Sequence, residues 1–209
     1  MVFLDRDGTL NEDLGYVFRI EDWRFTDRAL EAVRRLRDVV FAVALVSNQS
    51  GVARGLFTAA DVDELHVRVC QLMHRGGADP DAVAYCPHGP EDGCGCRKPW
   101  TGLAREVERQ LGRPIDYAAS WTIGDKPSDL GFGAALGTRT AVLRSRYWRD
   151  AACRPNRILS PTAFTRPRLR FWTCSSEQAT EIRWRFAPAG TWVRKCARKR
   201  VRAVGEPYV

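Results

Sequence analysis

The sequence contains no long hydrophobic run. No stretch approaches the roughly 18 uninterrupted apolar residues of a membrane-spanning helix. The N-terminus lacks the basic segment followed by an apolar run that marks an exported protein. These absences argue against a membrane helix and lead us to expect a cytoplasmic protein.

Residues 1–150 also lack an excess of positive charge, although the whole chain has a formal net charge of +8. They contain 20 Lys and Arg residues against 22 Asp and Glu, whereas residues 151–209 contain 13 against 3. A protein that follows a nucleic-acid backbone needs a basic surface that meets successive phosphates. We therefore expect residues 1–150 to act on a small molecule rather than on a nucleic acid.

The seven cysteines are odd in number, whereas a disulfide framework needs an even number. Three of them cluster around one histidine in a Gly- and Pro-rich loop: Cys86, His88, Cys94 and Cys96. Three thiolates and one imidazole complete a tetrahedral Zn²⁺ site with no open position, which is the arrangement of a structural site. We expect a zinc ion to order this loop in a reducing compartment.

Short apolar runs alternate with helical patterns through residues 1–150. The runs expected to form strands are residues 2–4, 39–46, 82–85, 121–123 and 140–143. Between them, apolar stripes with helical spacing follow the candidate N-caps Thr26 and Thr58, and a third stripe covers residues 103–111. This alternation predicts a three-layer α/β domain with a parallel sheet. Residues 151–209 show no clean periodicity, and we expect an irregular tail there.

Polar side chains follow three of the predicted strands, at Asp5, Ser47 and Asp125. Open parallel sheets bind ligands beyond the carboxyl ends of their strands. Asp5 and Asp7 are two residues apart, and their carboxylates repel each other unless a cation lies between them; Mg²⁺ prefers such oxygen ligands. A bare Asp-x-Asp-Gly pattern is as often a simple capped turn. The preceding apolar strand and the following Thr9-Leu10 favour a site.

Four segments together resemble the motifs of the haloacid dehalogenase superfamily of phosphatases. In chain order they are Asp5-x-Asp7-Gly8-Thr9, Ser47-Asn48-Gln49, Lys98, and Gly124-Asp125-Lys126-Pro127-Ser128-Asp129. No large insertion separates them, so the resemblance implies a Rossmann-like fold with a minimal cap.

The resemblance also implies a role for each residue. Asp5 would attack phosphorus and form an aspartyl-phosphate, and Asp7 would serve as general acid and then general base. Mg²⁺ would bind Asp5, the backbone carbonyl of Asp7, and Asp125, while Ser47 and Lys98 would hold the phosphoryl oxygens. Two interpretations of Asp129 stay open: an indirect contact with the metal, or a residue that caps a helix.

The cysteine-rich loop is similar to that of the histidinol-phosphatase and heptose-bisphosphatase subfamily. This implies hydrolysis of the 7-phosphate of a heptose 1,7-bisphosphate in lipopolysaccharide precursor synthesis, with histidinol phosphate as the alternative substrate. We expect a monomer. The residues that the resemblance assigns to the sugar phosphate are Asp13, Leu14, Gly15, Tyr16, Asn48, Gln49, Ser50, Arg97 and Lys98.

The resemblance ends near residue 150, so we predict a phosphatase domain over residues 1–150 and an unrelated basic tail over residues 151–209. The tail has two interpretations. It could bind nucleic acid or membrane, attached to an inactive phosphatase fold. We favour a frameshifted reading of a normal C-terminus, because reading its possible codons in another frame permits a short strand followed by an Ala- and Leu-rich helix.

Overall fold

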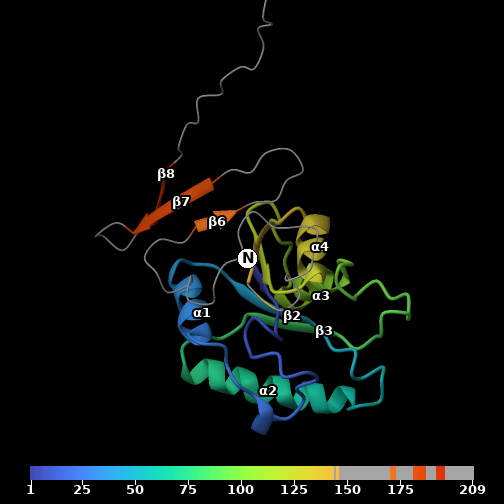
Figure 1. The fold of residues 1–209 in the computed structure, drawn as a ribbon. Coiled ribbons are helices and arrows are strands. Elements are labelled where there is room, and N and C mark those ends of the chain that lie inside the picture. Colours follow the sequence, from blue (N-terminus) through green and yellow to red (C-terminus); the bar gives the residue numbers. More distant parts are fainter. Residues whose placement is uncertain (144, 146–169, 173–180, 187–191, 196–209) are drawn as a thin grey trace, which may run out of the picture.

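The computed structural model describes residues 1–143, 145, 170–172, 181–186 and 192–195 (Figure 1). Five parallel strands form one sheet in the order β3-β2-β1-β4-β5. Their bounds are Val2–Leu4 for β1, Val43–Asn48 for β2, Ala82–Cys86 for β3, Trp121–Gly124 for β4 and Arg139–Val142 for β5. This arrangement confirms the predicted parallel α/β fold.

Helices cover both faces of this sheet and make three layers (Figure 1). Successive residues of a strand point to opposite faces. Val2 and Leu4 therefore pack with helices α1 and α2, whereas Phe3 packs with α3 and α4. The helices are α1 (Ala29–Asp38), α2 (Ala59–Arg75), α3 (Gly102–Leu111) and α4 (Pro127–Leu136), and a 3-10 turn, η1, covers Ile20–Asp22.

The ends of two elements differ from the sequence-based prediction. Thr58 does cap α2, but α1 begins after Arg28 rather than after Thr26. Arg28 has a left-handed backbone (φ 56°), and this turn delays the start of the helix. Strand β2 starts at Val43, because α1 continues to Asp38 and the next residues turn; Val40 is 93% exposed. An apolar run does not distinguish a strand from the turn before it.

Strand β3 lies at one edge of the sheet, next to β2 only. A side chain of α3 pairs with its backbone: the Gln110 Oε1 atom accepts a hydrogen bond from the Val83 N–H (3.1 Å), and Gln110 Nε2 donates to the Val83 carbonyl (2.8 Å). The side-chain amide thus takes the place that a neighbouring strand would occupy at this residue.

The C-terminal part contains three described strands, β6 (Arg170–Trp172), β7 (Glu181–Phe186) and β8 (Trp192–Lys195), which pair antiparallel in sequence order. The expectation of an irregular tail is wrong for these stretches. In β7 apolar residues alternate with charged ones at Ile182, Trp184 and Phe186, and this period of two indicates a strand. The predicted boundary at residues 150 and 151 and the first residues of the frameshift interpretation lie outside the described residues.

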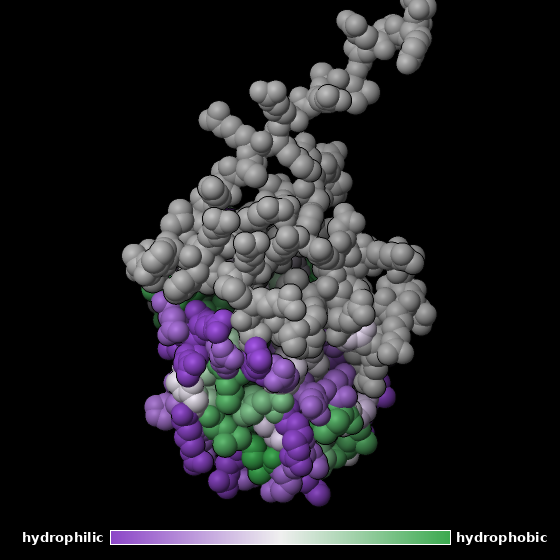
Figure 2. Space-filling view, turned by 60° about the vertical axis from the view of Figure 1, so that its left-hand side comes forward, coloured by the Kyte–Doolittle hydropathy of each residue, from purple (hydrophilic) through white to green (hydrophobic). Residues whose placement is uncertain are grey.

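The described surface mixes the two kinds of residue, with hydrophobic areas set among hydrophilic ones on the face in Figure 2. Among the described residues, no helix combines the length and apolar character needed to cross a membrane.

Candidate active site

Three acidic residues converge at the carboxyl ends of the central strands. Asp5 follows β1, Asp125 follows β4, and Asp129 lies in the first turn of α4. One carboxylate oxygen from each lies within 4.8 Å of the others, and all three residues are buried. The point at which the strand order reverses, between β1 and its two neighbours, is where such sheets bind ligands.

Lys98 brings a positive charge into this buried cluster. Its Nζ atom lies 2.6 Å from Asp5 Oδ1 and 2.7 Å from Asp129 Oδ1, and it donates to the Val46 carbonyl at 2.7 Å. The backbone of Lys98 is fixed by Asn48, whose Oδ1 accepts from the Lys98 N–H (2.9 Å) and whose Nδ2 donates to the Lys98 carbonyl (3.0 Å). Asn48 thus holds the lysine in place.

The two central carboxyl groups hold their protons more tightly than ordinary aspartates. Burial raises the pKa of Asp5 to about 6, with Asp129 adding to the effect and Lys98 opposing it. Burial also raises the pKa of Asp125 to about 7, against the nearby charge of Lys126. Asp5 Oδ2 is buried and receives no hydrogen bond from the described residues. Crowded carboxylates with a spare oxygen fit a divalent cation that prefers oxygen ligands, such as Mg²⁺.

Gly8 leaves room for one of these carboxylates. A Cβ atom added at Gly8 would lie 2.3 Å from Asp125 Oδ2, and the backbone of Gly8 has a φ of +91°. Only glycine satisfies both the close approach and the left-handed conformation without strain. The glycine of the first motif is therefore explained by its contact with the fourth.

Asp7 lies beside this cluster, and three side chains donate hydrogen bonds to its carboxylate or pair with it. Gln49 Nε2 donates to Asp7 Oδ2 (2.8 Å) and Asn11 Nδ2 to Asp7 Oδ1 (3.1 Å), while Arg6 Nη2 lies 2.9 Å from Asp7 Oδ2. Burial alone would raise the pKa of Asp7, but Arg6 and Gln49 outweigh it and lower the pKa below its usual value. Gln49 also donates to Ser47 Oγ (3.2 Å), which links Asp7 to the end of β2.

A cavity of about 400 Å³ opens over these residues. It is lined by every residue that the family resemblance assigns to the sugar phosphate except Leu14, whose side chain is mostly exposed. Ser47 and Asp125 are buried and are not among the residues that line the cavity. The lining residues are Asp5, Asp7, Asp13, Gly15, Tyr16, Asn48, Gln49, Ser50, Arg97, Lys98, Lys126 and Ser128.

Sequence reasoning did not single out Lys126 or Arg6. Lys126 Nζ donates to the Asp7 carbonyl (2.8 Å), the same oxygen that the sequence assigns to Mg²⁺, and lies 3.5 Å from Asp13 Oδ2. Its place directly after Asp125 was the available signal. The structure supports one of the two interpretations of Asp129, because its Oδ2 accepts from the Lys126 N–H (2.9 Å) and caps the start of α4, while its Oδ1 faces Lys98. The indirect contact with the metal stays a prediction.

The four residues of the cysteine-rich loop do come together. Cys96 Sγ lies 3.3 Å from Cys86 Sγ, 3.5 Å from Cys94 Sγ and 3.2 Å from His88 Nδ1. Atoms that share one tetrahedral metal lie at such separations, so the set is compatible with a metal ion. Arg97 Nη1 donates to the His88 carbonyl (3.0 Å), which ties a residue of the cavity to this loop.

Comparison with known proteins gives consistent matches. The profile of the polynucleotide kinase 3 phosphatase family matches residues 1–135. D-glycero-beta-D-manno-heptose-1,7-bisphosphate 7-phosphatase of Yersinia pestis is 40% identical over 149 residues, which cover 68% of this chain and 78% of that protein. The enzyme of the same name from Pseudomonas aeruginosa is 34% identical over 146 residues, covering 69% and 81%.

A solved structure agrees with these sequence matches. The crystal structure of D,D-heptose 1.7-bisphosphate phosphatase from B. bronchiseptica, complexed with magnesium and phosphate, superposes with a TM-score of 0.67. It is 32% identical and covers 75% of this chain and 89% of that one.

Proposed function

Because this chain belongs to the haloacid dehalogenase-type phosphatases of the polynucleotide kinase 3 phosphatase family, with heptose-bisphosphatases among its relatives, we propose that it removes the 7-phosphate of D-glycero-D-manno-heptose 1,7-bisphosphate. The observation that carries the proposal is the buried Asp5–Lys98 pair, which lies against the carboxylates of Asp125 and Asp129. A nucleophile, a phosphate-binding cation and a set of metal ligands are thereby adjacent.

Asp5 attacks phosphorus in this proposal. Its carboxylate opens into the cavity, and its contact with Lys98 orients it and offsets part of its charge. Formation of an aspartyl-phosphate splits the displacement into two easier steps. Lys98 and Ser47 stabilise the charge on the transferred phosphoryl oxygens, since preorganised donors are most effective where charge develops.

Asp7 acts as the general acid and base in this proposal. The donors around it favour its ionised form, which accepts a proton from the water that hydrolyses the intermediate. The dianionic phosphate of the substrate opposes this effect by like-charge repulsion, so that the same carboxyl group can donate a proton to the departing sugar oxygen.

Two metal ions complete the proposal. Asp5, Asp125 and the Asp7 carbonyl would hold Mg²⁺, which neutralises charge on the phosphoryl group when bound. Cys86, His88, Cys94 and Cys96 would hold a structural Zn²⁺, and the zinc loop presents Arg97, whose planar fork suits the second phosphate of a bisphosphate.

The proposals for location, oligomeric state and domain organisation rest on the sequence alone. We propose a cytoplasmic monomer that does not bind nucleic acid, with a phosphatase domain in residues 1–150. The frameshift interpretation of residues 151–209 is tested by the nucleotide sequence around codons 150–155: if no single-base change restores an Ala- and Leu-rich helix, the interpretation is wrong.

The test of the proposed function is phosphate release in the presence of Mg²⁺ from three substrates: the heptose bisphosphate, histidinol phosphate and a 3′-phosphorylated oligonucleotide. We expect the heptose to have the highest kcat/KM and Asp5→Asn to abolish turnover with all three. Preference for either other substrate would overturn the substrate assignment. Turnover by Asp5→Asn would overturn the assignment of the nucleophile.

A further inference from the structure

Arg6 lies between the two aspartates of the first motif and is fully buried, with 0% of its surface exposed. It is among the largest of the fully buried side chains in the described part of the chain. Burying a guanidinium is costly unless its charge and its N–H groups are paired. An apolar residue would fill this space at lower cost, so the contacts that Arg6 makes are the first evidence for its role.

The guanidinium approaches Asp7 side-on. Arg6 Nε donates to both carboxylate oxygens of Asp7, at 3.0 Å and 3.1 Å, and Nη2 lies 2.9 Å from Oδ2. Gln49 connects the same two groups, because its Oε1 accepts from Arg6 Nη2 (2.9 Å) while its Nε2 donates to Asp7 (2.8 Å). The three side chains form a closed ring, which fixes the plane of the Asp7 carboxylate as well as its position.

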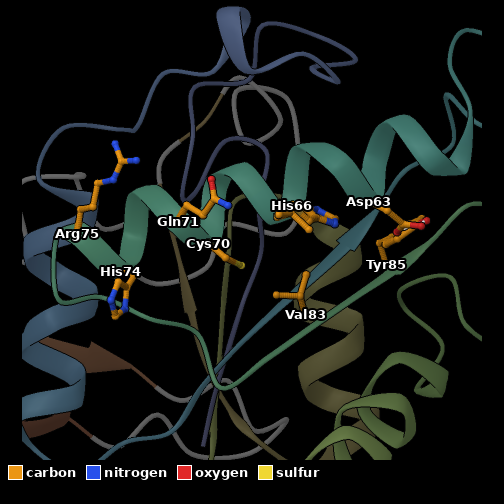
Figure 3. A pocket seen from close by; sticks show the side chains of 9 residues that line it. Asp63, His66, Cys70, Gln71, His74, Arg75, Val83 and Tyr85 are labelled. Carbon is orange, nitrogen blue, oxygen red and sulfur yellow. Dashed lines mark hydrogen bonds between the residues drawn. The ribbon is translucent and has the colours of Figure 1, made fainter.

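The far side of the guanidinium is held by the rest of the fold. Nη2 donates to the Val17 carbonyl (2.8 Å), Nη1 lies 3.5 Å from His66 Nε2, and the ring of Trp23 lies 5.9 Å from the guanidinium carbon. His66 lies on α2, where it lines a groove with Cys70 and Val83 (Figure 3). Burial and the nearby Arg6 lower the pKa of His66 to about 3, so the ring is neutral and does not repel Arg6 strongly.

We propose that Arg6 is the positioning residue for Asp7: it holds the carboxylate in the orientation from which a proton passes to and from the substrate. The inference rests on the proposed function, in which Asp7 is the general acid and base. Arg6 itself is absent from the lining of the cavity. Lysine would keep the positive charge but lacks the fork that bonds Asp7, Gln49 and Val17 at once.

The experiment compares kcat/KM for two substrates in Arg6→Lys. The heptose bisphosphate has an alkoxide leaving group that needs a proton, whereas para-nitrophenyl phosphate has a leaving group that departs without one. Loss of positioning should lower kcat/KM on the sugar phosphate by about 100-fold, at the lower end of what general acid catalysis contributes, and on the aryl phosphate by less than about 5-fold. General damage to the fold would lower both equally.

Two companion variants make the result decisive. Arg24→Lys is the matched control, because Arg24 makes the same kind of bonds to backbone carbonyls in the adjacent loop but is exposed and does not contact Asp7; it should leave both substrates unchanged. Asp7→Asn should show the same selective loss as Arg6→Lys. If Asp7→Asn is selective and Arg6→Lys is not, only the inference about Arg6 fails; if Asp7→Asn is not selective, the proposed role of Asp7 fails.

A measurement on the unaltered protein covers the case in which Arg6→Lys does not fold. A crystal structure of the wild-type protein with Mg²⁺ and phosphate should retain the contact between Arg6 and the Asp7 carboxylate. A carboxylate that has turned away from Arg6 in that complex would overturn the inference without any variant.

Discussion

Replacing Lys98 by methionine should destabilise the metal-free protein by a large and pH-dependent amount. The substitution removes the ammonium but keeps most of the side-chain volume, and it leaves Asp5 and Asp129 buried with no cation at 2.6 Å and 2.7 Å. Removing one partner of a buried pair typically costs about 3–5 kcal/mol. Since native domains have only about 5–15 kcal/mol in total, the variant should remain folded but with a greatly reduced margin.

The contribution of Asp5 to this cost has an upper limit, because a buried carboxylate without a partner takes up a proton. Asp5 already has a pKa of about 6 in the wild-type protein, so staying protonated at pH 7 adds about 1.4 kcal/mol, at 1.36 kcal/mol for each pH unit. At pH 5, which lies below this pKa, the added cost is close to zero. The difference between Lys98→Met and the wild-type protein should therefore shrink as the pH falls from about 7 to about 5.

Urea unfolding at the two pH values measures this difference directly. The matched control is Arg35→Met, which removes the cation of an exposed pair whose Nη2 lies 2.6 Å from Glu31 Oε1. Exposed pairs contribute about 0–1 kcal/mol, so this control should lose little. A loss in Lys98→Met no larger than that of Arg35→Met, or one that does not change with pH, would refute the reasoning.

Four further predictions concern the glycine, the carboxyl groups and the cysteine-rich loop. Gly8→Ala should lower both the activity and the stability against urea, because the added Cβ atom would lie 2.3 Å from Asp125 Oδ2 and the backbone there has a φ of +91°. Circular dichroism should show an otherwise native fold. Full activity in this variant would contradict the close approach. Mg²⁺ affinity, measured by calorimetry, should weaken as the pH falls below about 7, because protons retained by Asp125 and Asp5, with pKa values of about 7 and about 6, compete with the metal. The metal-free protein should also lose stability as the pH rises from about 4 to about 7, because these carboxyl groups lose their protons at a lower pH in the unfolded chain than in the folded protein. A rise in stability over this range would show that the pKa values of the carboxyl groups are not raised. Cys94→Ser should reduce the zinc content measured by atomic absorption and raise KM more than it lowers kcat, because the loop carries Arg97; an unchanged KM in zinc-depleted protein would separate the loop from substrate binding.

The sequence predicted the parallel sheet and the convergence at its edge because both depend on local patterns. Buried parallel strands are apolar throughout, as in Val2–Leu4 and Val43–Val46, and polar residues placed directly after such runs must meet at one edge. The apolar run therefore predicts the strand correctly even where the predicted ends differ from the observed ones, as they do at β2.

The sequence did not reveal what depends on contacts between distant residues. Nothing near Arg6 in the chain indicates that its side chain will be enclosed by Val17, Trp23 and His66. Asn48 was predicted only to contact substrate, and its side chain also holds the Lys98 backbone through two hydrogen bonds. Such assignments require three-dimensional proximity, which neither periodicity nor a motif supplies.

The amide of Gln110 has a consequence for the protein in a crowded cell. An edge strand presents unpaired N–H and C=O groups that can recruit a strand from another chain and begin aggregation. At Val83 both groups are already occupied by one side chain from α3, so an incoming strand would first have to displace it. Gln110 thus protects this part of the edge strand from pairing with another chain. Its replacement by an apolar residue would expose the backbone groups of Val83 to pairing between copies of the protein, and it would leave the active site at the carboxyl ends of the strands unchanged.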